Sequence, residues 1–187
     1  MDPLLSLLPA LLTLAVRHVM ESAFRRDAPS RDAGAALASL VCWYLAYSTI
    51  LALALSRIWA VPLTGQAWWG YAVWWGGIAL RLVSLREIGV YYHPLVLLRA
   101  KHRIVDTGPY RRLRHPLHLG LHVEMAGLVL LAADPLAWIA LGLSLLVLAR
   151  RNLQEERALE RFFGDAYSDY RRRTWDLVDL LPGLRRS

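Results

Sequence analysis

Long apolar blocks separated by arginine-rich segments constrain this chain more than any other feature. A membrane-spanning helix needs about 20 apolar residues, with a range of about 17–25. Five segments approach that length: 3–20, 35–57, 66–86, 117–133 and 135–151. Hydrophobic residues make up 56% of the 187 positions, more than an ordinary soluble domain carries. The sequence therefore predicts an all-α integral membrane bundle of five transmembrane helices.

The last two predicted spans are separated only by a short turn that ends in Asp134-Pro135. So short a connection predicts a tight helical hairpin, whose two outer ends return to the same side of the membrane. No strand is apparent, so no glycine-rich loop follows a strand and a soluble dinucleotide-binding domain is not expected. We expect residues 1–187 to form a single membrane domain.

Connections rich in basic residues alternate along the chain with connections that have few, and this alternation predicts the orientation of the bundle. They are frequent in segments 17–34 and 99–114 and in the tail after Arg150, whereas the other two connections carry one or none. The positive-inside rule then places the N-terminus outside and the C-terminus in the cytosol. Because no Lys or Arg precedes Pro3, the first block is interpreted as a retained span rather than a secretory signal. The preference for Arg over Lys suggests a prokaryotic inner membrane.

The net charge of +7 comes from 21 Arg and one Lys. Nucleic acid is one possible partner for so basic a chain, but these residues lie at the ends of apolar blocks, where they fix topology and meet anionic lipid headgroups. Membrane lipids are therefore the expected partners, and no nucleic acid is expected. Cys42 is the single cysteine, so an internal disulfide and zinc-finger spacings are both excluded.

The tail after Arg150 begins as a continuation of the fifth span. Apolar side chains there alternate with Glu and Arg at helical spacing: Leu153, Leu159, Phe162 and Phe163. This pattern predicts a cytosolic C-terminal amphipathic helix that packs on the membrane face of the bundle.

Several polar residues lie within the predicted spans. A polar side chain is costly inside a membrane, so each is expected to have a functional or structural role. His115, His118 and His122 share one helical face, and Glu124 follows them. Arg81 could snorkel to the interface, and His122 and Glu124 could bond across helices. Three histidines could hold zinc, but a di-iron membrane enzyme needs more clusters than six histidines supply. No metal is expected.

Two motifs lie at the ends of the predicted hairpin. The first reads His-Arg-Ile-Val-Asp-Thr-Gly-Pro-Tyr over 102–110 and Arg-His-Pro-Leu-His-Leu-Gly over 114–120. The second reads Arg-Arg-Asn-Leu-Gln-Glu-Glu over 150–156 and Phe-Phe-Gly-Asp-Ala-Tyr-Ser-Asp-Tyr-Arg-Arg-Arg over 162–173. Because a hairpin returns its ends to one side, we expect the two motifs to meet.

In these motifs the chain resembles the isoprenylcysteine carboxyl methyltransferases and the related phospholipid N-methyltransferases. That pattern is His-x-Leu-Val-x-x-Gly-x-Tyr, Arg-His-Pro-x-Tyr-x-Gly, a hairpin, Glu-Glu and Phe-Gly-x-x-Tyr-x-x-Tyr. The resemblance covers about residues 76–182, whereas residues 1–65 match only as accessory spanning helices. One departure is His118, where the family usually has Tyr.

The resemblance implies that the chain uses S-adenosyl-L-methionine, held by segments 99–120 and 150–173, to methylate a lipophilic acceptor. It assigns Glu155 to a polar group of the cofactor and Arg151 to the acceptor. The other cofactor-binding positions that it implies are His102, Arg103, Ile104, Val105, Tyr110, His115, Pro116, Leu117 and His118.

The chemistry of the acceptor is left open by the sequence. A carboxylate of the isoprenylcysteine type would be oriented by Arg151 and would need no base. A phospholipid amine or a lipophilic phenol would be helped by a base, for which Glu156 and His118 are the candidates. Arg151, Glu156 and His118 are thus the candidate catalytic residues. The acceptor is expected to enter sideways from the bilayer, and no obligate protein partner is evident.

Two functions of other classes are the alternatives. A membrane reductase that uses NADPH would need its own nicotinamide-binding pattern, and none is found in the sequence. A membrane adaptor without enzymatic activity would tolerate changes at Glu155 and Arg151 with no effect on ligand binding.

Overall fold

A computed structural model describes residues 33–60, 65, 67–92 and 103–180, and every regular element within these ranges is helical. The all-α prediction is therefore confirmed for the described residues. The predicted first span, 3–20, and His102 lie outside them. The elements in chain order are α2 (Ala33–Ala60), α3 (Ala67–Ile88), η1 (Gly89–Tyr91), η2 (Gly108–Arg111), α4 (Pro116–Ala132), α5 (Pro135–Phe163), α6 (Asp165–Arg173) and η3 (Leu177–Leu180).

The four predicted spans after residue 34 coincide with helices α2 to α5. Two of these helices contain a stretch long and apolar enough to cross a membrane, namely Val41–Trp59 in α2 and a window within α5. Helix α4, with 17 residues, is a shorter apolar helix. These helices indicate an integral membrane protein, while the number of five spans stays a prediction.

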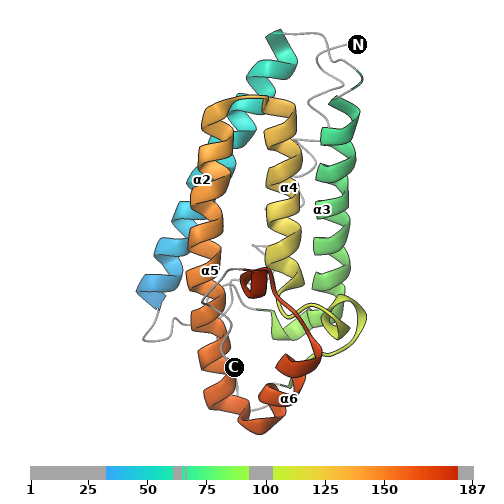
Figure 1. Cartoon of the computed structure of the whole chain (residues 1–187), viewed down its shortest axis with the longest axis vertical. Coiled ribbons are helices and arrows are strands. Elements are labelled where there is room, and N and C mark those ends of the chain that lie inside the picture. Colours follow the sequence, from blue (N-terminus) through green and yellow to red (C-terminus); the bar gives the residue numbers. More distant parts are fainter. Residues whose placement is uncertain (1–32, 61–64, 66, 93–102, 181–187) are drawn as a thin grey trace.

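Helices α2 to α5 run along the long axis of the molecule, with α4 between α3 and α5 and with α2 packed across α4 and α5 (Figure 1). The turn between α4 and α5 is closed by Ala133 in the left-handed conformation and by the Asp134 carboxylate, which accepts a hydrogen bond from the Leu136 N–H at 2.7 Å. Pro135 then begins α5, where no N–H is needed. The predicted hairpin is confirmed.

Glycines allow α3 and α4 to touch along their backbones. Gly70 and Gly77 are seven residues apart on α3, and Gly120 and Gly127 have the same spacing on α4. A Cβ atom at Gly77 would lie 2.4 Å from the Glu124 backbone nitrogen. Small residues at such spacing let membrane helices approach closely, and this interface is the most extensive in the fold.

A buried ion pair crosses the same interface. The Arg81 guanidinium donates to both Glu124 carboxylate oxygens, at 2.8 and 3.1 Å. The Glu124 side chain is almost completely buried. The structure therefore shows that Glu124 bonds across helices, as expected for a polar residue within a span. Its partner is Arg81, for which snorkelling to the interface was the other interpretation.

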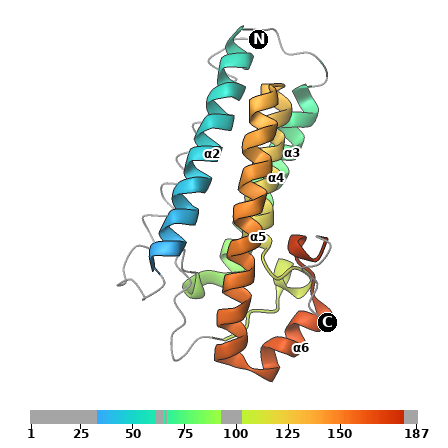
Figure 2. The same ribbon diagram turned by 60° about the vertical axis from the view of Figure 1, so that its left-hand side comes forward.

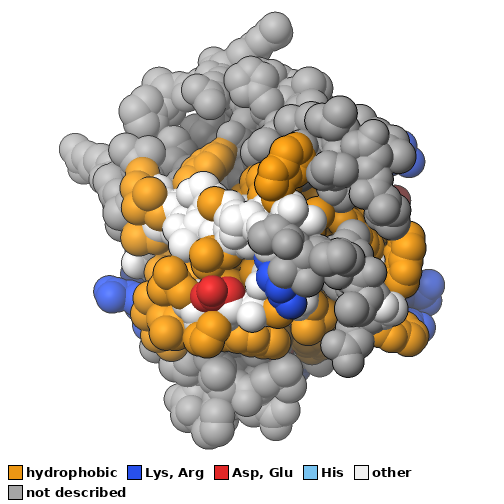
Figure 3. Space-filling view, turned by 90° about the horizontal axis from the view of Figure 1, so that it is seen from above, with side chains coloured by type: hydrophobic (Ala, Val, Ile, Leu, Met, Phe, Trp, Pro, Cys, Tyr) orange, Lys and Arg blue, Asp and Glu red, His pale blue; other side chains and the backbone are white. Residues whose placement is uncertain are grey.

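Exposed tryptophans gather at the end of the bundle that carries the hairpin turn. Trp59 ends α2, Trp68 and Trp69 begin α3, and Trp138 begins α5, and all four are exposed. Figure 3 looks onto this end, where hydrophobic side chains cover much of the described surface. Tryptophan is enriched at membrane–water interfaces, so we expect this end to lie at one interface and the arginine-rich end at the other.

Two adjacent glycines of α3 give a matched test of the helix contact. We expect Gly77→Ala to destabilise the protein by about 1–3 kcal/mol, because the new methyl group collides with the backbone of α4. A Cβ atom at Gly76 would have nothing within 4 Å. Gly76→Ala should therefore stabilise the protein by about 0.5–1 kcal/mol, since Ala favours the helix more than Gly does. Thermal unfolding in detergent measures both. Equal melting temperatures would contradict the close approach of α3 and α4.

Candidate functional site

The hairpin brings the segment before α4 beside the second half of α5. His115 is the N-cap of α4, and α5 continues past residue 151 to Phe163 before Gly164 turns the chain into α6. Figures 1 and 2 both show α6 turning back beneath the segment that precedes α4. The two sequence motifs therefore meet at one end of the bundle.

Arg114 is the centre of the contacts that hold this end together. Its Nε lies 2.6 Å from Glu156 Oε1, and its Nη2 lies 2.6 Å from Asp179 Oδ2. Its Nη1 donates to the carbonyl oxygens of Arg171 and Thr174, at 3.3 and 3.0 Å. One buried guanidinium thus joins α5, the end of α6 and η3.

Tyr170 and Trp175 fix the turn that leads to His115. The Tyr170 hydroxyl donates to the Tyr110 carbonyl at 2.8 Å and contacts the Leu113 carbonyl at 3.2 Å. The backbone of Arg114 pairs with that of Trp175 beside an isolated bridge between Leu113 and Trp175. These bonds make the segment before α4 a fixed support for the His115 ring.

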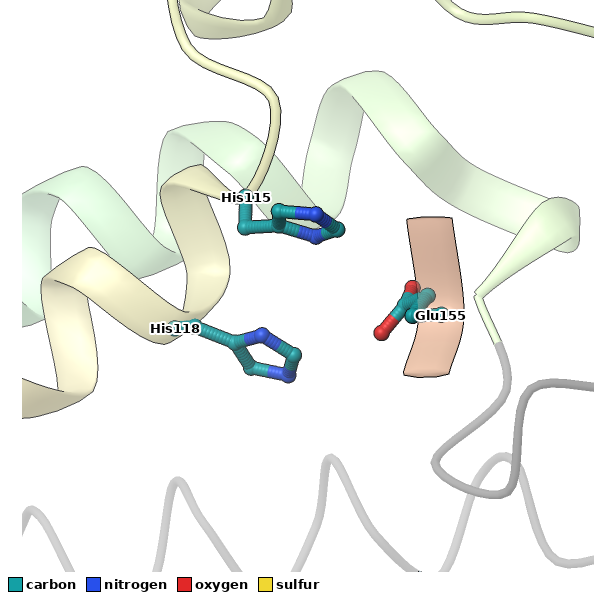
Figure 4. Close-up of side chains that lie close together, drawn as sticks. All are labelled: His115, His118 and Glu155. Carbon is teal, nitrogen blue, oxygen red and sulfur yellow. The ribbon is translucent and has the colours of Figure 1, made fainter. Parts of the chain in front are cut away.

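His115, His118 and Glu155 point into one shared space (Figure 4). One nitrogen of each ring and one Glu155 carboxylate oxygen all lie within 4.8 Å of one another. The two imidazoles are stacked, with centroids 5.6 Å apart and an angle of 15° between the rings. A donor and acceptor set of this kind can hold a small polar molecule.

Polar atoms without partners surround this space. The buried side-chain atoms of the described residues that have no hydrogen bond include Tyr110 Oη, His115 Nε2, Glu155 Oε2 and Tyr167 Oη. A buried polar group without a partner is costly and rare. The cluster is therefore a candidate binding site, because a polar ligand would satisfy atoms that the chain itself leaves unbonded.

Burial and the nearby carboxylates set the protonation of this site. Burial and the charge of Glu155 raise the pKa of Tyr110, and burial with Glu156 and Glu155 raises the pKa of Tyr167, so both phenols remain neutral donors. Burial alone would lower the pKa of His115. Glu156, whose Oε1 lies 3.7 Å from His115 Nε2, and Glu155 outweigh it, so the pKa of His115 is raised. The site combines a histidine that favours its charged form with neutral hydroxyl groups.

A chain of hydrogen bonds orients His118. Its Nδ1 lies 2.7 Å from Asn152 Oδ1, and Asn152 Nδ2 donates to Asp176 Oδ2 at 2.8 Å. Asn152 and Asp176 are both buried. On its other side the His118 ring contacts the Trp43 indole from α2, with centroids 5.1 Å apart.

Arg151 lies beside the same tryptophan. Its guanidinium carbon is 5.3 Å from the centre of a Trp43 ring, a cation–π contact, and the side chain is buried. Trp43 also contacts His122 and donates from Nε1 to the Ser144 carbonyl at 3.3 Å. Arg151 and His118 therefore share one aromatic neighbour, on the side of the site toward the apolar part of the bundle.

The other predicted residues fall into two groups. Arg103, Ile104 and Val105 lie in the irregular segment before η2, with the Arg103 guanidinium 5.5 Å from the Tyr91 ring. Pro116 and Leu117 form the first turn of α4, where Pro116 is buried and Leu117 is half-buried.

The Glu156 carboxylate lies between two arginine side chains, an environment that does not suit a general base. One carboxylate oxygen faces Arg114 at 2.6 Å, and the other lies 3.8 Å from Arg171 Nε. Two guanidinium groups stabilise its charged form and oppose its protonation. Of the two candidate bases, His118 is the one that the geometry favours.

Among the residues that the structure describes, two groups of side chains have the spacing of metal ligands. One is His115, His118 and Glu155, and the other is His115, Glu156 and Asp176. In the second group Arg114 already neutralises Glu156, and Asp176 accepts from Asn152. Those contacts account for the second group without an ion, and the expectation of no metal stays a prediction.

Sequence reasoning missed Arg114, Asn152, Asp176, Tyr167 and Trp43 as parts of this site. The first four lie inside or beside the recognised motifs, and the acidic Asp176 within a basic tail was a usable signal. Trp43 gave no such signal, because a tryptophan in an apolar helix is expected wherever the helix packs.

Comparisons with known proteins agree with the geometry. A model of the isoprenylcysteine carboxyl methyltransferase family matches residues 68–161. The chain is 29% identical over 124 residues to a protein-S-isoprenylcysteine O-methyltransferase of Dictyostelium discoideum, an alignment that covers 61% of this chain and 51% of the relative. It is 29% identical over 119 residues to protein-S-isoprenylcysteine O-methyltransferase B of Arabidopsis thaliana, covering 60% of each.

A third relative is the protein-S-isoprenylcysteine O-methyltransferase of Schizosaccharomyces pombe, which is 30% identical over 109 residues, covering 57% of this chain and 46% of the relative. The chain spans about half the length of the curated relatives that it matches. The matched family segment begins in α3 and ends in α5, so it contains the hairpin with His115, His118 and Glu155.

Proposed function

The chain belongs to the isoprenylcysteine carboxyl methyltransferase family, and from this premise we propose that it transfers a methyl group from S-adenosyl-L-methionine to a lipophilic acceptor within the membrane. The observation that carries the proposal is the cluster of buried polar atoms without partners where the two motifs meet, around His115, His118 and Glu155. The relatives, named as isoprenylcysteine O-methyltransferases, make a carboxylate of the isoprenylcysteine type the first acceptor to test.

The donor set suits this cofactor. S-adenosyl-L-methionine carries a carboxylate, an ammonium group, hydroxyl groups and a sulfonium cation. Glu155 would pair with the ammonium or a hydroxyl, and a charged His115 would attract the carboxylate. The Tyr110 and Tyr167 hydroxyls would meet the remaining polar groups. The cofactor, when bound, supplies the activated methyl group.

The acceptor would lie on the other side of His118, next to Arg151 and Trp43. The Arg151 guanidinium can orient a carboxylate through two parallel hydrogen bonds, and the Trp43 indole offers an apolar wall to the attached chain. The enzyme then contributes alignment of the two reactants and exclusion of water, which together account for much of the rate gain in such displacements. A carboxylate is already ionised and needs no base.

We place this site on the cytosolic side of the membrane, because the arginine-rich end of the bundle carries it. The cofactor would enter from the cytosol and the acceptor from the bilayer.

Isothermal titration in detergent with S-adenosylhomocysteine and with NADPH separates the classes of function. A methyltransferase binds the first and ignores the second, and a reductase does the reverse. An adaptor binds neither and would contradict the proposal. Methyl transfer from radiolabelled donor to N-acetyl-S-farnesylcysteine then tests the carboxylate acceptor.

Glu155→Ala and His115→Ala are each expected to weaken S-adenosylhomocysteine binding by on the order of ten-fold or more, because a charge-assisted hydrogen bond contributes about 1.5–3 kcal/mol. Titration calorimetry measures the change. Glu160→Ala is the matched control. Its carboxylate lies further along α5 and pairs with Arg171 of α6, so its removal should leave the affinity unchanged. Unchanged affinity in folded Glu155→Ala protein would remove Glu155 from the site.

A further inference from the structure

The hydrogen bonds around Asn152 determine which nitrogen of His118 carries the proton. The Asp176 carboxylate has only acceptor oxygens, so the side of Asn152 that faces it at 2.8 Å must be the amide NH2 group. The other Asp176 oxygen accepts from the Leu177 N–H at 2.8 Å. The Asn152 oxygen therefore faces His118 Nδ1, and at 2.7 Å that nitrogen must be the donor.

An imidazole that donates from Nδ1 in its neutral form has a bare Nε2. Within the described residues, no hydrogen bond to Nε2 accompanies the one from Nδ1. The His118 ring lies in the candidate site, stacked on His115 and against Trp43. His118 thus presents a proton acceptor at the place where the methyl acceptor is expected.

We propose that Asp176 and Asn152 are positioning residues that hold His118 with Nε2 as the open proton acceptor, so that the chain also methylates a lipophilic phenol. This inference rests on the proposed methyl transfer and adds a second class of acceptor to the carboxylate, which arrives without a proton to lose.

The charges around His118 favour a phenol over an amine. Its titratable and charged neighbours are His115, Glu155 and His122, together with Arg151, which packs on the same Trp43 ring. An alkylammonium group would place a second cation near Arg151. A phenol becomes an anion as it reacts, and Arg151 attracts that anion. A phenol hydroxyl, with a pKa of about 10, also releases its proton far more readily than an aliphatic alcohol.

The step balances as follows. The phenol hydroxyl gives its proton to His118 Nε2, and its oxygen forms a bond to the methyl carbon of the sulfonium. The bond between that carbon and sulfur breaks, and its electron pair stays on the sulfur as a neutral thioether. The His118 imidazolium then releases the proton to water.

Asp176→Asn tests the arrangement with almost no change of shape. The new side chain keeps its oxygen on the Leu177 N–H and turns an NH2 group toward Asn152. The Asn152 amide must then rotate, so that its NH2 group faces His118 Nδ1 and the ring proton moves to Nε2. Asp169→Asn, at an exposed position paired with Arg172, makes the same chemical change away from this chain of bonds and is the matched control.

Nitrogen-15 NMR of ring-labelled histidine reads the tautomer directly, with the His118 signals identified by their loss in His118→Gln. We expect a bare Nε2 in the unchanged protein and in Asp169→Asn, and a protonated Nε2 in Asp176→Asn. A protonated Nε2 in the unchanged protein would overturn the inference.

Turnover supplies the second readout, as the ratio between pentadecylphenol and N-acetyl-S-farnesylcysteine. This ratio should fall by on the order of 100-fold in Asp176→Asn, since general bases contribute about 10²–10⁴, and should stay constant in Asp169→Asn. A purely structural role of Asp176 would lower both activities together and overturn the inference, as would phenol methylation that survives the change. If neither acceptor is methylated and S-adenosylhomocysteine does not bind, the proposed function fails, and the NMR spectra still decide the tautomer.

Discussion

Arg114→Ala is expected to detach the C-terminal segment from the bundle and to cost about 3–5 kcal/mol of stability. The substitution leaves the buried Glu156 carboxylate without its 2.6 Å partner and also removes the guanidinium that pairs with Asp179. Breaking a buried ion pair by removing one member costs about this much, and Glu156 would keep only its longer contacts with His115 at 3.7 Å and Arg171 at 3.8 Å. Thermal unfolding in detergent should show the loss, and limited proteolysis should show new cleavage after Gly164.

Two variants make this result specific. Arg112→Ala removes an exposed arginine two residues earlier and should leave both the melting temperature and the cleavage pattern unchanged. Arg114→Lys keeps the charge but lacks the planar fork that reaches Glu156 and Asp179 together, so it should rescue only part of the loss. A cleavage pattern for Arg114→Ala that matches the unchanged protein would show that α6 and η3 do not depend on this residue.

Arg151→Ala is expected to lower kcat/KM for a carboxylate acceptor by on the order of 100-fold, since removing one member of a buried charged pair costs about 2–5 kcal/mol. S-adenosylhomocysteine binding should remain within about two-fold, because Glu155, one turn further along α5, is the residue proposed to face the cofactor. Arg151→Lys should recover part of the activity, as a single ammonium group cannot match both carboxylate oxygens.

The control for this experiment is Arg150→Ala, which removes an exposed neighbouring arginine of the same helix. Calorimetry and steady-state kinetics on the same preparations separate the two roles. Normal turnover of Arg151→Ala would defeat its assignment to the acceptor. A loss of cofactor affinity as large as that in Glu155→Ala would instead make Arg151 a partner of the cofactor site.

The helical class, the hairpin and the meeting of the two motifs could all be predicted from the sequence. Apolar blocks of this length form helices because every backbone group in a membrane must bond within its own segment. A short turn between two such helices brings their outer ends to the same side of the bundle. The proximity of His115 and Glu155 could therefore be predicted from the sequence. The family also followed from the order of short motifs around that hairpin.

The pairing of side chains within the candidate site, in contrast, is visible only in the tertiary structure. Glu156 and His118 were equal candidates for a base in the sequence, and the packing of α6 and η3 separated them by pairing Glu156 with Arg114. Trp43 reached the site from a helix outside the matched family segment. The physical reason is that a side chain's protonation and freedom depend on neighbours far away in the sequence. Helical spacing places a residue on a face, whereas Asp176, 58 residues after His118, determines which nitrogen of that histidine is bare.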